Sequence, residues 1–190
     1  MSETRLVILL HQLIFQGMFV TKNIILTRKI GKQIRGKNRE ATIAIAYFAF
    51  FICLALILSF FRQPLGTIHL INDRFAMILG VGLIVLNLVV SGASLLNLKD
   101  SWRVGVLEDQ KTELVTSGIY RMTRNPYFVS YILMFAAYTI FLQNITLLGL
   151  SIVGFIFIHN MILKEEHYLH SVHGDSYLDY KKNVPRYLIF

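Results

Sequence analysis

The chain has 190 residues, of which 55% are hydrophobic, and its mean hydropathy is +0.56. These values exclude an ordinary soluble domain, in which the apolar fraction is lower and polar residues alternate with apolar ones. The net charge is +8, and the charges lie in a few short loops, which favours anchoring to a membrane surface over nucleic-acid binding.

The first two apolar blocks, residues 6–26 and 41–61, are each long enough for one membrane-spanning helix, which needs about 20 residues. A basic tract separates them, and short loops rich in Lys and Arg remain in the cytoplasm, so we predict a cytoplasmic loop here. Near the start stand Glu3 and Arg5, and no cleavage site follows the first block, so we expect no cleaved signal peptide. The positive residues of the basic tract are Arg28, Lys29, Lys32, Arg35, Lys37 and Arg39.

The third block, residues 75–98, carries small and weakly polar residues near one face at helical spacing: Gly80, Asn87, Ser91 and Ser94. Such residues let helices approach closely in lipid, so we predict a packing face. A long polar stretch, 99–126, precedes a short apolar block, 127–142, an uncharged two-residue turn and a last block, 145–163. The short turn predicts an antiparallel helical hairpin.

Five predicted spans indicate an all-α, polytopic integral membrane protein that forms one membrane domain over residues 1–190. We expect three spans in residues 1–98 and the candidate site in residues 99–190. With an odd number of spans and a cytoplasmic basic loop, the N-terminus lies outside, and the C-terminus and the candidate site face the cytoplasm. The hairpin returns the polar clusters that flank it, 118–126 and 165–166, to one side of the membrane.

The second polar cluster is a pair of carboxylates, Glu165 and Glu166. Carboxylates at a membrane surface are costly to bury unless a cation stands beside them. Arg121, Arg124 or Lys164 could supply structural ion pairs, and a cationic ligand is the alternative.

The first polar cluster places the ring of Tyr120 beside cations, and aromatic faces attract sulfonium and ammonium groups. Pro126 keeps Asn125 out of the helical conformation and suits the first turn of the next helix. This segment, residues 118–126, which we call the corner, is therefore predicted to be stiff where the chain enters the membrane. Such a corner suits a ligand pocket, and it also suits a plain helix start.

Four motifs in order resemble the isoprenylcysteine carboxyl methyltransferases and the phospholipid methyltransferases. They are Leu-Val-Thr-Ser-Gly-Ile-Tyr at 114–120, Arg-Asn-Pro at 124–126, Glu-Glu at 165–166 and Gly-Asp-Ser-Tyr-Leu-Asp-Tyr at 174–180. The resemblance covers roughly residues 102–186, while the first two spans match only in hydropathy. The chain departs from the family's pattern at Asn125, where many members have His, and at Phe128, where Tyr is usual, so neither position is expected to be a catalytic base.

The resemblance implies an S-adenosylmethionine-dependent methyltransferase of the membrane that acts on a lipophilic acceptor, foremost by carboxyl O-methylation of an isoprenylcysteine-like substrate. A phospholipid N-methyltransferase is the alternative, and an NADPH-dependent reductase of the sterol or steroid type, which has a similar pocket motif, is a further one. The remaining alternative is a small membrane protein without enzymatic activity, whose charged residues only fix its topology. The expected partners are the lipid bilayer and a lipophilic or prenylated substrate, without nucleic acid or metal, and the expected location is a bacterial or archaeal cell membrane.

The same resemblance assigns roles to residues of the candidate catalytic half, 99–190. The catalytic residues are Arg124 and Glu166. The cofactor-binding residues are Gly118, Tyr120, Arg124, Asn125, Pro126, Glu165 and Glu166. The candidate substrate-binding residues are Trp102, Arg121, Tyr177 and Arg186. Trp102 could equally be an interfacial anchor, and the tail with Tyr177 and Arg186 could equally anchor the chain to the membrane surface.

Methyl transfer requires mainly positioning and desolvation from the protein. An acceptor carboxylate is already ionised at neutral pH, whereas an amine must lose a proton, for which Glu165 or Glu166 is the candidate base. Arg121 or Arg124 could hold a carboxylate through two parallel hydrogen bonds.

The histidines near the C-terminus are not expected to form a metal site. His167, His170 and His173 recur at three-residue steps on what reads as a solvated surface, and Cys53 stands alone in an apolar block. From Lys164 the chain is polar again and is expected to be helical up to the Gly174–Asp175 break. On such a continued helix, His159 and Glu166, seven residues apart, lie on one face. His159 could therefore contact a ligand or a neighbouring helix.

Overall fold

The computed structural model describes residues 3–31, 39–61, 65–103 and 113–188, without the side chains of residues 40 and 41. Its α-helices are α1 (Glu3–Ile30), α2 (Arg39–Leu58), α3 (Asp73–Leu98), α4 (Pro126–Leu142), α5 (Ile145–His173) and α6 (Asp175–Asn183). Two short 3-10 helices, η1 (Lys99–Ser101) and η2 (Gly118–Arg121), lie between α3 and α4. Within these ranges, the sole β contact is an isolated bridge between Thr67 and Asn144.

The helices have the length and composition of a membrane protein. Three stretches, Glu3–Ile30, Asp73–Ser101 and Ile145–His173, are long and apolar enough to cross a bilayer, and Thr42–Leu58 and Pro126–Leu142 are shorter apolar helices. Large apolar side chains on their outer faces, such as Leu13 and Ile78, are exposed, as expected for surfaces in contact with lipid. The predicted all-α, polytopic membrane protein is therefore confirmed.

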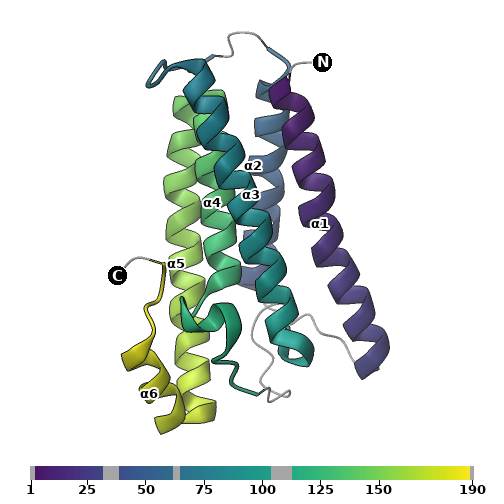
Figure 1. Ribbon diagram of the computed structural model, residues 1–190, viewed down its shortest axis with the longest axis vertical. Coiled ribbons are helices and arrows are strands. Elements are labelled where there is room, and N and C mark those ends of the chain that lie inside the picture. The colour runs from purple at the N-terminus through teal and green to yellow at the C-terminus, as the bar shows by residue number, and fades with distance from the viewer. Residues whose placement is uncertain (1–2, 32–38, 62–64, 104–112, 189–190) are drawn as a thin grey trace.

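Five of the helices run alternately up and down in one bundle (Figure 1). The C-terminal ends of α1, α3 and α5 and the N-terminal ends of α2 and α4 lie at one end, together with η2 and α6. The N-terminus of α1 lies at the opposite end. The hairpin therefore brings the 118–126 cluster and the glutamate pair to the same end, as predicted, and the cytoplasmic orientation of that end stays a prediction.

The packing face predicted on α3 is confirmed. Gly80, Asn87, Ser91 and Ser94 are all buried, and a Cβ on Gly80 would come within 2.7 Å of the Phe141 ring of α4. The side chain of Asn87 also donates to the carbonyl oxygen of Ser130 at 2.6 Å. Close approach and a hydrogen bond thus fix α4 against α3.

The first span joins the same packing face through polar side chains inside the bundle. The two ring nitrogens of His11 lie 2.7 Å from Asn87 Oδ1 and 2.6 Å from the hydroxyl of Tyr138. His11 is buried, so its ring nitrogens need partners, and those partners tie α1 to α3 and α4.

The predicted hairpin between α4 and α5 is also confirmed. Gln143 takes a left-handed conformation with φ of 40°. The side chain of Asn144 caps α5 by accepting from the backbone nitrogens of Thr146 at 3.0 Å and Leu147 at 3.3 Å. A turn this short leaves α4 and α5 antiparallel neighbours.

The helix that follows the last apolar block continues to the Gly174–Asp175 break, as predicted. α5 runs beyond residue 163 to His173, so Glu165 and Glu166 lie within this helix. Gly174, with φ of 52°, ends it. Residues 32–38 of the basic tract and 104–112 of the polar stretch lie outside the described residues.

Candidate functional site

The corner that precedes α4 is attached to the end of α3. The side chain of Asn97 accepts a hydrogen bond from the backbone nitrogen of Ile119 at 2.8 Å, which fixes the start of η2. Gly118 has φ of 61°, and a Cβ at this position would come within 2.1 Å of Asn97 Oδ1. Both the conformation and the space therefore require glycine.

Replacing Gly118 by Ala is expected to lower the stability of the protein by about 1–2 kcal/mol, the scale of a forced left-handed conformation. The added methyl group also displaces Asn97. Equilibrium unfolding in mixed micelles measures the change. Gly149→Ala is the matched control, because Gly149 lies in a helix with nothing within 4 Å of the added Cβ. Equal stability of the two variants would contradict the constraint at Gly118.

The predicted role of Pro126 as a helix start is confirmed. Pro126 is the first residue of α4, and Asn125 before it has φ of −129° and ψ of 51°, outside the helical region. The carbonyl oxygen of Asn125 accepts from the backbone nitrogen of Val129 at 3.0 Å. Its side chain is left to point away from α4 and toward α5.

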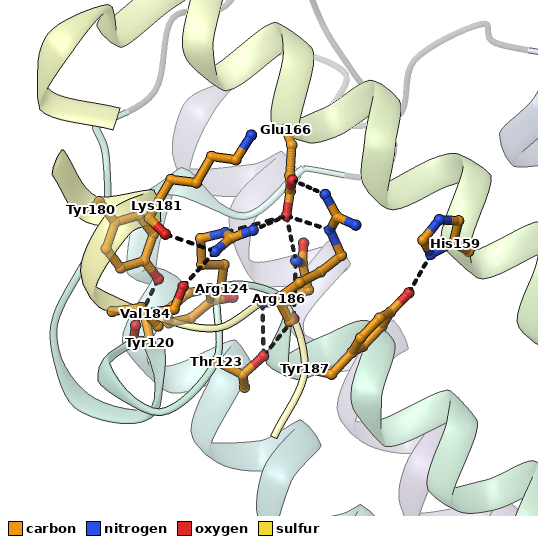
Figure 2. A network of polar contacts seen from close by, with 11 residues as sticks. Tyr120, Thr123, Arg124, His159, Glu166, Tyr180, Lys181, Val184, Arg186 and Tyr187 are labelled. Atoms are coloured by element: carbon orange, nitrogen blue, oxygen red, sulfur yellow. Dashed lines mark hydrogen bonds and ion pairs between the residues drawn. The ribbon is translucent and has the colours of Figure 1, made fainter. Parts of the chain in front are cut away.

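Glu166 on α5 is the centre of a charged cluster, which we call the Glu166 cluster: Arg124, Asn125, Glu166 and Arg186 (Figure 2). Arg124 donates to Glu166 Oε1 from Nη2 at 2.9 Å and from Nε at 3.2 Å. Asn125 Nδ2 donates to the same oxygen at 3.3 Å. Arg186 donates from Nε to Oε1 at 3.1 Å and from Nη2 to Oε2 at 2.9 Å. Only 5% of Glu166 is exposed, so these donors replace water around its charge.

The segment that carries Arg186, residues 184–188, follows α6 and lies across the corner; we call it the strap. Its backbone oxygens accept hydrogen bonds from the corner: Pro185 from Arg124 N at 2.9 Å and Arg186 from Thr123 Oγ1 at 2.8 Å. Arg124 Nη1 donates to the carbonyl oxygen of Val184. The corner thus holds the strap in place, and the strap holds Arg186 against Glu166.

His159 of α5 contacts Tyr187, which belongs to the strap. His159 Nδ1 lies 2.8 Å from the hydroxyl of Tyr187, and the two rings stack at 6.3 Å between centroids. Figure 2 shows this contact on α5, beside the Glu166 cluster. His159 therefore contacts the strap rather than a neighbouring helix.

Three tyrosines form a buried cluster beside the corner: Tyr120, Tyr177 and Tyr180. The hydroxyl of Tyr180 donates to the carbonyl oxygen of Tyr120 at 2.6 Å, and the hydroxyl of Tyr120 lies 2.9 Å from Ser94 Oγ on α3. Burial raises the pKa of Tyr177 to about 12 and also raises the pKa values of Tyr120 and Tyr180. All three tyrosines are therefore neutral at physiological pH. They supply aromatic faces, and the hydroxyls of Tyr120 and Tyr180 supply hydrogen bonds.

Trp102 lies in a different group of side chains. It is buried with its ring 4.6 Å from that of Tyr127 and 6.0 Å from that of Phe19, measured between centroids. Its indole nitrogen donates to Asn23 Oδ1 on α1 at 2.8 Å. Trp102 thus joins α1 to the start of α4, next to the corner, and makes no contact with the Glu166 cluster among the described residues.

Two further residues of the predicted site stand apart from the cluster. Arg121 is exposed, and Glu165 is partly exposed. Within the ranges that the structure describes, neither side chain makes a hydrogen bond or an ion pair. In those same ranges no three His, Cys, Asp or Glu side chains gather as a metal site would require.

Several contacting residues were not among the predicted ones. Thr123 is fully buried and binds the strap, and Asn97 fixes η2. The carbonyl oxygens of the strap are equally part of the arrangement. Thr123 lies two residues before Asn125, whose backbone nitrogen donates to its hydroxyl at 3.2 Å, and such a local turn is the one signal that the sequence offered.

The arrangement combines a buried carboxylate, arginine donors and tyrosine faces at one end of a membrane bundle. In this structure the arginines form ion pairs with the carboxylate, and groups of these kinds can also bind a charged small molecule. They are suited to a reaction in which positioning and charge compensation do most of the work.

Comparison with known proteins assigns the chain to a family. A family model described as phospholipid methyltransferase matches residues 75–176, from α3 to the start of α6 and including the corner and Glu166. A protein-S-isoprenylcysteine O-methyltransferase of Schizosaccharomyces pombe is 40% identical over 73 residues, which are 38% of this chain and 31% of that protein. The proteins of the same name from Dictyostelium discoideum and Xenopus laevis are 38% identical over 72 residues and 33% identical over 89 residues.

These matches cover 37% and 45% of this chain in the last two cases, and 30% and 31% of those relatives. The chain thus matches about a third of the length of each relative. The family model, in contrast, covers more than half of the chain. The resemblance read from the four motifs is confirmed, and the chain belongs to the phospholipid methyltransferase family.

Proposed function

We propose that this protein is a membrane methyltransferase that transfers the methyl group of S-adenosylmethionine to a lipophilic acceptor. One observation carries the proposal: the α4–α5 hairpin brings the Arg124–Asn125 corner and Glu166 into direct contact, with 2.9 Å between Arg124 Nη2 and Glu166 Oε1. Within a methyltransferase family, a buried carboxylate beside tyrosine faces suits a ligand that carries positive charge.

The cofactor is proposed to bind at the corner, with Gly118, Tyr120, Pro126 and the glutamate pair around it. S-adenosylmethionine has a sulfonium, an ammonium and a carboxylate, and the corner offers carboxylates, aromatic rings and arginines. The protein's contribution to methyl transfer is to hold the methyl group in line with the acceptor and to exclude water.

The acceptor is proposed to be a carboxylate of an isoprenylcysteine-like molecule. The names of the relatives from three organisms support this class, and Arg121 and Trp102 are the proposed contacts beside the cofactor. The description of the family model supports a phospholipid amine as the second candidate. An amine must lose a proton, for which Glu165, partly exposed, is the better placed of the two glutamates.

The position of the corner suits an acceptor that arrives from the bilayer. With 17 residues α4 is about 25 Å long, which is shorter than the hydrocarbon core of about 30 Å. The corner at its start therefore lies close to the acyl chains rather than far out in water. We propose that this end faces the cytoplasm of a bacterial or archaeal cell, where the cofactor is available.

Calorimetric titration of the purified protein in detergent tests the cofactor. Binding of S-adenosylmethionine and S-adenosylhomocysteine but not of NADPH is the expected result. Binding of NADPH alone would indicate a reductase, and the absence of binding by all three would contradict the proposal.

Transfer of a labelled methyl group tests the acceptor. A prenylcysteine analogue and phosphatidylethanolamine are compared in the same vesicles, and labelling of the prenylcysteine is the expected result. Labelling of phosphatidylethanolamine alone would instead assign the protein to amine methylation.

A further inference from the structure

The carboxylate proposed to meet the cofactor is already occupied by a cation of the protein itself. The two oxygens of Glu166 are occupied differently (Figure 2). Oε1 accepts from Arg124, Asn125 and Arg186, more donors than the two lone pairs of one oxygen can serve well. Oε2 accepts only from Arg186 among the described residues. Removal of Arg186 would therefore free one oxygen and leave the other fully bonded.

The two arginines are also held differently. The side chain of Arg124 is 7% exposed and that of Arg186 is 28% exposed. Arg124 Nη1 is bound to the carbonyl oxygens of Lys181 and Val184, so the whole guanidinium is fixed. Arg186 Nη1 has no hydrogen-bond partner in the described part of the chain. The Arg186 side chain can therefore rotate into water once its two hydrogen bonds to Glu166 are broken.

The backbone of the strap does not have to move for this to happen. Its carbonyl oxygens stay bound to Arg124 and Thr123, and Tyr187 stays bound to His159. A guanidinium stays protonated at physiological pH even without a partner, so the Arg186 side chain leaves as a cation. Glu166 then keeps Arg124 as its counter-ion, which avoids the penalty of an unpaired buried charge.

We propose that Arg186 is a placeholder: a positively charged group of the cofactor takes its place at Glu166 Oε2, and the Arg186 side chain moves out to solvent. The inference rests on the proposed function and adds an exchange step to it. One cation replaces another, so the charge around Glu166 is the same before and after. Arg186 lies outside the segment that the family model matches.

Arg186→Gln is expected to raise the affinity for S-adenosylmethionine, whereas replacing a residue that contacts a ligand usually lowers it. A placeholder competes with the ligand, so its removal is expected to tighten S-adenosylmethionine binding about ten-fold, if the state with Arg186 displaced is about one tenth populated in the free protein. A residue that binds the ligand directly would instead weaken binding when replaced. Calorimetric titration compares the variant with the wild type. Lys182→Gln is the matched control, because Lys182 is an exposed cation of the same region, paired with Asp179.

The choice of ligand identifies the exchanging group. Tighter binding of both S-adenosylmethionine and S-adenosylhomocysteine would assign it to the ammonium that both carry, and tighter binding of the first alone to the sulfonium. Weaker or unchanged binding of both overturns the proposal. If neither protein binds either nucleoside, the proposed function fails as well, whereas wild-type binding with a weaker variant contradicts the placeholder alone.

A second measurement uses the wild-type protein and does not depend on the folding of a variant. Phenylglyoxal modifies accessible guanidinium groups, and mass spectrometry reports each site. Saturation with S-adenosylmethionine is expected to increase the modification of Arg186 several-fold. Arg74 is the internal control, because it is exposed and lies in the first turn of α3, whose N-terminal end is at the opposite end of the bundle. Protection of Arg186, or no change, would contradict its displacement.

Discussion

Glu166→Gln is expected to weaken S-adenosylmethionine binding about ten-fold or more, the scale of one charge-assisted hydrogen bond. It is also expected to lower the free energy of unfolding by about 3 kcal/mol, because two arginines lose the charge that they share. The substitution keeps the shape and one carbonyl oxygen, so both effects report the charge. Calorimetric titration gives the affinity, and equilibrium unfolding in mixed micelles gives the stability.

Glu165→Gln is the matched comparison, since it makes the same substitution one residue away. Glu165 makes no hydrogen bond or ion pair among the described residues, so its replacement is expected to change stability little. Its effect on affinity shows which glutamate contacts the cofactor. Unchanged affinity in Glu166→Gln, together with a loss in Glu165→Gln, would move the cofactor contact from Glu166 to its neighbour.

The spans and the hairpin could be predicted because their signals are local. Apolar blocks give the helices, and the uncharged turn at 143–144 gives the antiparallel pair. The end of α5 was indicated by a different local signal. The segment from Lys164 to His173 is polar and lies beyond the apolar block, so hydropathy indicates only where the chain leaves the lipid. The Gly174–Asp175 break indicates where the helix stops.

In the candidate site, too, the features with local sequence signals could be predicted and the others could not. A hairpin flanked by charges was enough to predict that the 118–126 cluster and the glutamate pair lie at one end of the bundle. It left several cations open as partners, and the structure shows that Arg124 and Asn125 bond to Glu166. The position of the strap was not predictable, because it depends on backbone carbonyl oxygens that every residue has. The contact between His159 and Tyr187 joins residues 28 positions apart through this strap, and no periodicity in the sequence indicates it.

Arg124→Gln is expected to be the most destabilising single change at this end of the bundle, at about 3–5 kcal/mol. Arg124 and Glu166 have side chains that are 7% and 6% exposed, so water cannot replace the lost donors. The carbonyl oxygens of Lys181 and Val184 lose a donor at the same time, and each unsatisfied buried group adds to the loss. Equilibrium unfolding in mixed micelles measures the change, with Arg121→Gln, an exposed arginine three residues away, as the control.

The double variant Arg124→Gln, Glu166→Gln separates the ion pair from the bonds to the strap. If the loss in Arg124→Gln comes mainly from leaving Glu166 short of a counter-ion, removal of that charge as well should restore about 1–3 kcal/mol relative to the sum of the single losses. The carbonyl oxygens of the strap remain without Arg124 in both cases, so that part of the loss stays. Strict additivity would contradict the ion-pair explanation and would mean that Arg124 stabilises the protein chiefly by holding the strap, which also carries the arginine proposed to exchange with the cofactor.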